Sequence, residues 1–328
     1  MIPSPDRRLF LLITQLSLVC VLLLSVAGYL GRLSKYAELA SHFRLQYLLG
    51  SSACLLACFL SREWAWASAA AVGVAINLVE VASWSISGRN LAGNRAGWRR
   101  VKLILANVNF ENTAHETFIA FAQRHAPDIL VVQEVDAAWC DSLQALKSLY
   151  PFSETKSEDG GSGMALYSRF QFEPLTIDLP ESGARPGILV NMKVDGVSVS
   201  LLSLHPRTPV RTRHFKLRNE MLAAAADCLQ NLPAPKVLVG DLNITPWSHY
   251  YWSFVKQTRL APVRKGFGLL PSWPAFLFFK WLMIPLDHCL VSGDIKVIEV
   301  RTGERIGSDH LPLIIELEIP QNQTTQSE

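Results

Sequence analysis

Three long apolar runs open the chain, and each has the pattern of a membrane-spanning helix. The first, residues 9–31, contains no charged residue and is long enough to cross a hydrocarbon layer of about 30 Å. The second, residues 45–60, is shorter and barely reaches spanning length. The third, residues 64–86, carries Trp near both ends, where a membrane–water interface favours it. We therefore predict a membrane domain of about three transmembrane helices in residues 1–86.

The basic residues around the apolar runs indicate whether the first run is cleaved as a signal peptide and how the helices are oriented in the membrane. Arg7 and Arg8 precede the first run, as in a signal peptide, but its length and the two following runs favour a retained anchor. With Arg7, Arg8 and Arg62 on one side, the opposite side would carry the larger positive charge. The positive-inside rule then places the rest of the chain in the cytoplasm, anchored in a bacterial inner or plasma membrane. If the second run does not span, this orientation reverses.

Two polar residues, Asn77 and Glu80, interrupt the third run and would share one helix face. An ionisable residue at membrane depth is a candidate functional site. A Glu paired inside a small helical bundle is the alternative, and we favour it here.

The rest of the chain is patterned as a globular α/β domain. A Gly-, Asn- and Arg-rich linker spans residues 87–100, a catalytic domain residues 101–319, and a polar, disordered tail residues 320–328. Apolar, β-branched segments predict strands at 101–108, 128–135, 163–168, 236–240, 287–292, 295–301 and 312–319, and a hairpin at 188–204 around Asp195-Gly196. Helices are predicted at 113–125, 138–149 and 211–232. Strands outnumber helices, so we predict an α/β (α+β) fold of two packed mixed β-sheets flanked by helices.

The charge and the cysteine content narrow the function only slightly. The formal net charge of +3 among 328 residues does not by itself indicate a nucleic-acid-binding protein. The six cysteines show neither metal-ligand spacing nor a disulfide framework.

Acidic, amide and His residues follow several predicted strands at the points where the strands end. They lie in the sequences NVN (107–109), QE (133–134), HP (205–206), DLN (241–243), DH (287–288) and SDH (308–310). Carboxylate and amide oxygens suit Mg²⁺ or Mn²⁺, whereas the chain has no His/Cys cluster of the kind that binds zinc. The pattern indicates phosphoryl transfer assisted by a hard divalent metal.

These motifs resemble the DNase I-like endonuclease/exonuclease/phosphatase superfamily, which includes apurinic endonucleases, sphingomyelinases and inositol-phosphate phosphatases. The resemblance covers about residues 101–319 and rests on ANVN, VVQEV, GMALYSR, LLSLHP, VLVGDLN, PLDHCLVS and GSDHLPL, in that order. It implies the two-sheet sandwich and a hydrolase acting on phosphate esters, here in a bacterial-type member with N-terminal transmembrane segments.

On the metal side, the resemblance implies that Glu134 binds the ion, supported by Asn107 and with Asp309 nearby. Asn109 stands where some members carry Asp, which leaves a second metal in doubt and makes Asn109 a candidate substrate contact.

On the catalytic side, the resemblance implies that Asp241 orients or deprotonates water and that Asn243 holds a phosphate oxygen. His310, oriented by Asp287, would be a second base or a phosphate contact, and His205 would act on the leaving-group side. The acidic partner of His205 stays open among Glu154, Glu158 and Asp159.

An apolar stretch, residues 264–285, lies between two of the motifs. One hypothesis makes it a hydrophobic loop packed on its own domain. The other has aromatic residues dipping into the membrane interface and basic residues holding a phosphate. The side chains concerned are Arg264, Lys265, Trp273, Phe276, Phe278, Phe279 and Trp281.

The leading hypothesis is a membrane-anchored, divalent-metal-dependent phosphoesterase that cleaves a phosphodiester or phosphomonoester by in-line attack of water. Its substrate could be a lipid. A membrane-tethered nuclease acting on DNA or RNA is the alternative, with Arg207, Arg211, Arg213 and Arg218 as the basic residues nearest to a strand-binding stripe. A non-catalytic ligand- or partner-binding protein would be expected to lack at least one of five residues that the chain keeps: Glu134, Asp241, Asn243, Asp309 and His310.

Overall fold

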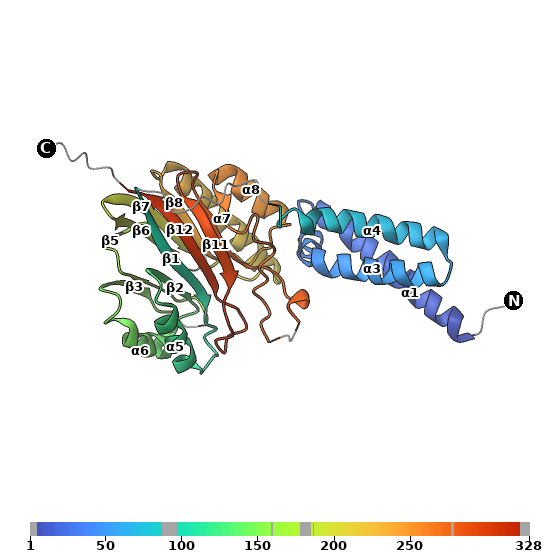
Figure 1. Cartoon of the computed structure of the whole chain (residues 1–328), viewed down its shortest axis with the longest axis horizontal. Helices are drawn as coiled ribbons and strands as arrows, with labels where there is room; N and C mark the ends of the chain where they lie inside the picture. The colour runs from blue at the N-terminus through green and yellow to red at the C-terminus, as the bar shows by residue number, and fades with distance from the viewer. Residues whose placement is uncertain are drawn as a thin grey trace. The chain divides into compact units, whose positions relative to one another are not determined.

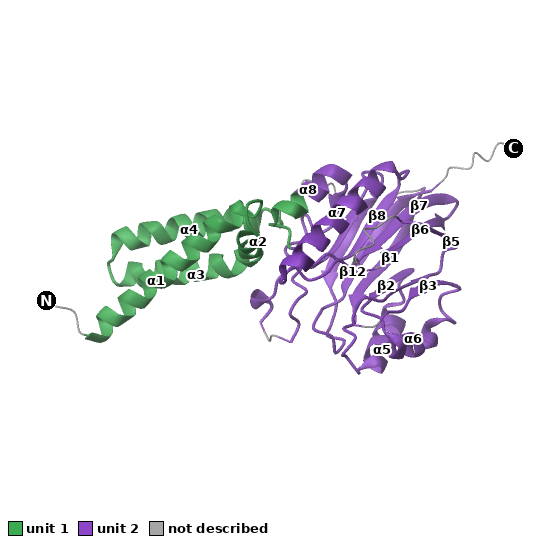
Figure 2. Ribbon diagram, turned by 180° about the vertical axis from the view of Figure 1, so that it is seen from behind, with its two compact units in different colours: residues 1–86, 245–252 green, residues 87–244, 253–328 purple. Residues whose placement is uncertain are grey.

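The computed structural model describes residues 5–86, 97–158, 160–177, 185, 187–276 and 279–321. The chain forms two compact units, one of residues 1–86 with 245–252 and the other of residues 87–244 with 253–328 (Figure 2). Most of the predicted linker, the end of the predicted tail, Asp159 and Phe278 lie outside the described residues.

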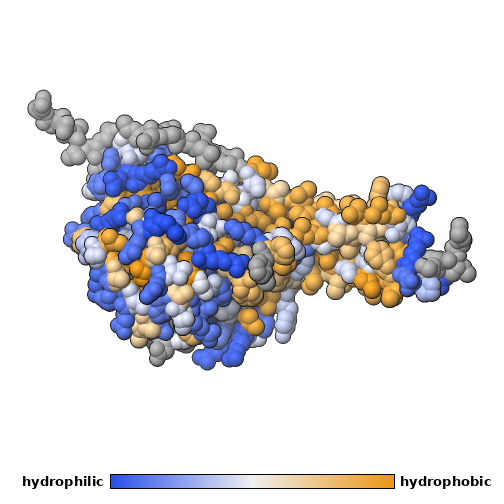
Figure 3. Space-filling model, turned by 60° about the horizontal axis from the view of Figure 1, so that its bottom comes forward, coloured by the Kyte–Doolittle hydropathy of each residue, from blue (hydrophilic) through white to orange (hydrophobic). Residues whose placement is uncertain are grey.

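The N-terminal unit is a helical bundle that exposes many large hydrophobic side chains, and the face of it drawn in Figure 3 is largely hydrophobic. Its helices are α1 (Pro5–Ala27), α2 (Lys35–Ala40), α3 (Arg44–Leu60) and α4 (Trp64–Ala82), with single 3-10 turns at Gly28–Leu30 and Ser41–Phe43. Three helical segments, Pro5–Leu30, Lys35–Leu60 and Trp64–Ala82, are long and apolar enough to cross a membrane. The three predicted spans are therefore helices of suitable length and composition.

Polar side chains form hydrogen bonds between the helices of this bundle. The Asn77 amide donates to Ser25 Oγ at 2.9 Å, and Arg44 Nη1 donates to the Ser25 carbonyl at 2.8 Å and to Asn77 Oδ1 at 3.4 Å. The Tyr29 hydroxyl donates to Glu80 Oε1 at 2.7 Å. Asn77 and Glu80 thus have partners within the bundle, as the favoured interpretation expected.

The other unit contains two six-stranded mixed sheets (Figure 1). In the first sheet the spatial order is β11 (Lys296–Thr302), β12 (Leu313–Pro320), β1 (Trp98–Asn107), β2 (Ile129–Gln133), β4 (Met164–Ser168) and β3 (Phe152–Lys156). In the second it is β5 (Phe172–Leu175), β6 (Gly187–Val194), β7 (Val197–Leu204), β8 (Lys236–Asp241), β10 (Asp287–Val291) and β9 (Ala261–Pro262). The helices are α5 (His115–His125), α6 (Ala137–Leu143), α7 (Thr212–Asn231) and α8 (His249–Thr258), and two 3-10 turns lie at Gln144–Leu146 and Lys280–Leu282.

The alternation of side chains along the strands explains this architecture. On β1, Leu103 and Leu105 belong to the apolar core shared with strands of the second sheet, whereas Ile104 and Ala106 pack with residues of α5 and α6. A strand buried on both faces needs apolar residues at every position, as β1 has from Leu103 to Ala106. The predicted fold of two packed mixed sheets flanked by helices is confirmed.

The elements missed from the sequence are mostly short or at sheet edges. β3, β5 and β9 are edge strands, and β3 alternates between half-buried and exposed positions, which gives a weak apolar signal. Helix α8 begins with an aromatic sequence of modest helix propensity. The predicted hairpin is confirmed, with Asp195 and Gly196 both at positive φ in its two-residue turn.

Candidate active site

The polar motifs converge because the strands that carry them end at the same edge of the two sheets. β1 runs parallel to β2, and β7 runs parallel to β8, so Asn107, Gln133, Leu204 and Asp241 all stand at carboxyl ends. Asp287 opens β10 directly opposite Asp241 in the antiparallel register. All of these residues lie in the sheet-containing unit.

Asp241 is the centre of the site and is almost completely buried. Its Oδ1 accepts from the Asn243 backbone N–H at 2.8 Å, and its Oδ2 lies 3.5 Å from His205 Nε2 and 3.6 Å from His310 Nε2. Burial alone would raise the pKa of Asp241, but His310 and His205 outweigh it and hold the pKa well below its usual range. The carboxylate is therefore ionised and faces both imidazoles.

His310 forms a pair with Asp287, whose Oδ2 lies 2.8 Å from His310 Nδ1. Burial lowers the pKa of His310, but the carboxylates of Asp287 and Asp241 outweigh it and raise the pKa to about 10. His310 is thus an imidazolium with Nε2 directed at Asp241. A fixed cation at this position suits contact with a phosphate oxygen.

The predicted metal ligands form an adjoining group of oxygen-bearing side chains. Asn107 Nδ2 donates to Glu134 Oε1 at 3.0 Å, and Asn109 Nδ2 donates to Asp309 Oδ1 at 3.1 Å. Among the residues that the structure describes, no three His, Cys, Asp or Glu side chains form a ready-made metal cage. The group fits Mg²⁺, which binds through one or two carboxylates and completes its shell with water and phosphate oxygens.

Three site residues have left-handed backbone conformations. Asn109, Glu134 and Asn243 have φ values of 57°, 64° and 50°. This region is uncommon for residues other than Gly, and it tends to be retained where the surroundings fix a functional side chain. The conformation of Glu134 turns the chain at the end of β2, just after buried Gln133.

Gln133, whose importance was not predicted, joins the two sheets beneath the site. Its Nε2 donates to the Leu204 carbonyl at 2.8 Å, and its Oε1 accepts from the Asp241 backbone N–H at 2.8 Å. The side chain is fully buried. Both ends of this amide therefore fix strand ends that carry site residues.

Replacing Gln133 with Leu should destabilise the protein by about 2–6 kcal/mol, because two buried backbone groups each lose a partner at about 1–3 kcal/mol. The measurement is denaturant unfolding of the detergent-solubilised protein. Gln144→Leu is the matched control, since Gln144 makes an exposed hydrogen bond on the helical surface. Equal stability of the two variants would contradict the bridging role.

His205 and Asn243 are held by groups that the sequence did not reveal. Arg185 Nη1 lies 2.7 Å from His205 Nδ1, and His205 Nε2 lies 3.7 Å from Glu134 Oε1. Asn243 Nδ2 donates to the Pro206 carbonyl at 3.0 Å. Glu154 lies on β3, and within the described part of the chain neither Glu154 nor Glu158 forms a hydrogen bond or ion pair with His205. The groups next to His205 are therefore Asp241, Glu134 and Arg185, a residue that no local motif marked.

Two of the predicted substrate contacts, Arg264 and Trp273, have hydrogen-bond partners within the protein. Arg264 is buried, and its guanidinium donates to the main-chain carbonyls of Leu269 and Asp287, so it braces the start of β10. Trp273 Nε1 donates to Asp309 Oδ2 at 2.9 Å, which places the indole at the site. Lys265, the residue after Arg264, is half-buried.

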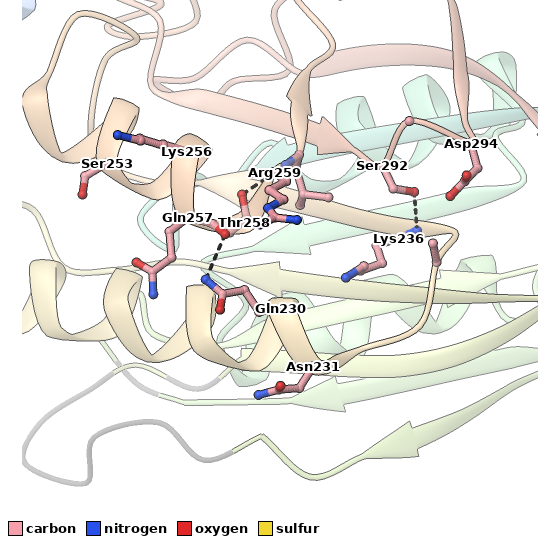
Figure 4. A pocket seen from close by; sticks show the side chains of 13 residues that line it. Gln230, Asn231, Lys236, Ser253, Lys256, Gln257, Thr258, Arg259, Ser292 and Asp294 are labelled. Carbon is pink, nitrogen blue, oxygen red and sulfur yellow. Dashed lines mark hydrogen bonds between the residues drawn. The ribbon is translucent and has the colours of Figure 1, made fainter.

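A cavity of about 880 Å³ lies at the opposite end of β8, lined by residues such as Lys236, Gln257, Arg259 and Asp294 (Figure 4). Lys236 opens β8 and Asp241 closes it, so this cavity is separate from the cluster around Asp241.

Comparison with known proteins agrees with the fold. The family model described as endonuclease/exonuclease/phosphatase matches residues 104–310. A search of curated proteins found no match. An endonuclease/exonuclease/phosphatase structure from Beutenbergia cavernae is 19% identical with a TM-score of 0.54, over 68% of this chain and 72% of that one.

Two structures of TDP2 from D. rerio are also similar. A humanized form is 14% identical with a TM-score of 0.56, and a complex with a single-strand DNA product is 15% identical with the same TM-score. Each comparison covers 66% of this chain and 98% of the other. At these identities the likeness shows the fold, whereas the family model matches well over half of the chain. The chain therefore belongs to the endonuclease/exonuclease/phosphatase family, and it is a hydrolase acting on phosphate ester bonds.

Proposed function

We propose that this protein is a membrane-anchored, divalent-metal-dependent phosphoesterase that cleaves its substrate by in-line attack of water. The single observation that carries the proposal is the position of Asp241, a buried carboxylate that contacts His205 and His310 and lies beside the Asn107–Glu134 pair. The anchor is formed by the three apolar helices. The distribution of Lys and Arg favours a cytoplasmic catalytic unit.

Glu134, with Asn107 and Asp309, would hold Mg²⁺ or Mn²⁺, which neutralises charge on the phosphate oxygens when bound. Asp241 orients the attacking water and accepts its proton, since it is ionised and its second oxygen faces the centre of the cluster. The Asn243 amide and the His310 imidazolium stabilise the charge that develops on the phosphate oxygens. His205 lies on the leaving-group side.

Arg185 adds a cation that suits an anionic substrate. Burial lowers its pKa, and the carboxylates of Glu134 and Asp241 partly offset this effect. The Arg207, Arg211 and Arg213 side chains lie close enough to His214 to lower its pKa together with burial. This basic group, together with the fold shared with a TDP2 captured with single-strand DNA product, supports a nuclease as the second candidate.

The proposal is tested by assaying detergent-solubilised protein on plasmid DNA, RNA, phospholipids, sphingomyelin, inositol phosphates and a chromogenic phosphodiester. Each substrate is tested with Mg²⁺, with Mn²⁺ and with EDTA. Metal-dependent turnover of one class would support the proposal and identify the substrate. Turnover of no class by folded, metal-binding protein would favour a non-catalytic binding role.

An exposed aromatic segment favours a lipid among these substrates. Phe276, Phe279 and Trp281 are 65, 57 and 47% exposed, on the loop that Trp273 ties to Asp309. Large aromatic side chains exposed together are typical of a surface that contacts a membrane interface. They would bring a lipid headgroup to the site.

Replacing these three residues together with Ser should lower turnover of vesicle-bound substrate at least ~10-fold, since each aromatic group moved out of water contributes about 1.5–3 kcal/mol. Turnover of a short soluble diester should not change. Val210→Ser, at an exposed apolar residue before α7, is the control. Equal loss on both substrates would contradict a lipid-binding role.

A further inference from the structure

The segment that follows the Asp241–Asn243 motif joins the N-terminal helices rather than the sheets. Residues 245–252 group by their contacts with residues 1–86, whereas Asn243 and Ile244 group with the catalytic unit (Figure 2). Asn243, a predicted transition-state contact, therefore lies only two residues before Thr245, which belongs to the helical unit. Sequence analysis had placed this segment in the catalytic domain alone.

Four buried side chains form a polar network within the helical unit. The Ser248 hydroxyl donates to Glu38 Oε1 at 2.8 Å, and Glu38 Oε2 lies 3.6 Å from His42 Nε2. His42 Nδ1 lies 2.9 Å from Thr245 Oγ1. Ser248 Oγ also accepts from the Tyr250 backbone N–H at 3.1 Å, at the start of α8. Each member is at most 5% exposed.

Residues at the end of α4 hold the same segment. Trp247 Nε1 donates to the Glu80 carbonyl at 3.3 Å. The Trp84 ring stacks on Trp252 with centroids 5.7 Å apart and meets Tyr251 edge-on at 6.4 Å. The short helix α2, the turn after it and the end of α4 therefore all contact residues 245–252.

The residues just before this segment are fixed within the catalytic unit. The Asn243 carbonyl accepts from Arg218 Nη1 at 3.1 Å, and the Ile244 carbonyl lies 2.7 Å from His288 Nε2. Burial lowers the pKa of His288 well below its usual value, and the charge of Arg264 lowers it further. His288 is therefore neutral and donates this hydrogen bond. Asn243, at positive φ, and Ile244 thus have hydrogen-bond partners within the catalytic unit, directly before the segment that begins at Thr245.

A simple anchor would not need this network. A buried carboxylate is costly unless it has good partners, and directional polar contacts fix the position of a segment more narrowly than apolar packing does. We propose that Glu38 and His42 are positioning residues of the active site, which hold Thr245 and Ser248 and thereby keep Asn243 in its catalytic conformation. This inference rests on the proposed hydrolase function.

The first test compares Ser248→Ala with Ser68→Ala in the full-length protein. Ser68 makes only an exposed bond to its own helix, so it controls for loss of a hydroxyl. We expect kcat for a soluble chromogenic diester to fall about tenfold in Ser248→Ala, with KM unchanged, because loss of a hydrogen bond to a charged group is of that size. Glu38→Leu should show the same kcat loss, and Glu38→Gln, which keeps an oxygen acceptor, should restore activity. An unchanged kcat, or a change in KM alone, would overturn the inference.

The second test places Ser248→Ala in an Asn243→Ala background. If Ser248 acts through Asn243, its loss has no further effect on kcat there. Multiplicative losses, as expected from a general structural role, would overturn the inference.

Hydrogen exchange of residues 241–248 gives a readout independent of turnover. Ser248→Ala should speed exchange in this segment and leave β1 and β2 unchanged, and unchanged exchange in the segment would overturn the positioning role. Lack of turnover by the wild-type protein would instead count against the proposed function, and the exchange result would still decide this inference.

Discussion

Replacing Asp241 with Asn should lower kcat by about 10³-fold while leaving the fold intact. The amide keeps the size of the carboxylate and can still accept the Asn243 N–H, but it carries no charge and cannot take a proton from water. General-base catalysis contributes about 10²–10⁴-fold. Loss of the charge next to His205 and His310 adds to the effect. The measurement is steady-state turnover of a soluble chromogenic diester under saturating Mg²⁺.

Asp227→Asn is the matched control, because Asp227 lies on the exposed face of α7 and bonds Gln257. It should keep wild-type kcat. An Asp241→Asn enzyme with more than about a hundredth of wild-type kcat would exclude Asp241 as the principal base, given the lower end of that range.

The second large effect concerns His310 and Asp287. Replacing His310 with Gln should lower kcat about 10²–10³-fold, because the site loses a fixed cation that faces the phosphate. Asp287→Asn removes the carboxylate that orients His310 through a 2.8 Å contact. Since Asp287 acts through His310, the double variant should be no worse than His310→Gln alone.

His125→Gln serves as the control for loss of an imidazole, since His125 pairs with Glu304 on the surface. Kinetics of the two single variants and the double variant are measured on the same diester. Losses that multiply in the double variant would show that Asp287 and His310 act separately.

Much of the fold could be predicted because its signals are local. The apolar runs, the buried strands such as β1 and the Asp195-Gly196 turn each depend on a short stretch of sequence. Edge strands were missed because their solvent-facing sides dilute the apolar pattern. Helix α8 was missed because its aromatic residues follow neither the apolar period of an amphipathic helix nor that of a half-buried strand.

The site was predictable only in part, because motifs name residues but not their neighbours. Asp241, His310 and Glu134 stand in recognisable sequences, whereas Arg185 lies in no motif and reaches His205 through the fold. The burial of Arg264 and its hydrogen bonds to main-chain carbonyls could not be predicted from the sequence. The Glu38–Ser248 contact joins residues 210 positions apart, and nothing local to either predicts it.

The most direct test of metal-dependent hydrolysis at this site is a Mg²⁺ titration of diester turnover by the wild type, Glu134→Gln and Asp241→Asn. We expect no wild-type turnover in EDTA and recovery on adding Mg²⁺. Glu134→Gln should need a higher Mg²⁺ concentration for half-maximal turnover, whereas Asp241→Asn should stay inactive at every concentration. Wild-type turnover that persists in EDTA, or titration curves in both variants that match the wild type, would contradict metal-dependent hydrolysis at this site.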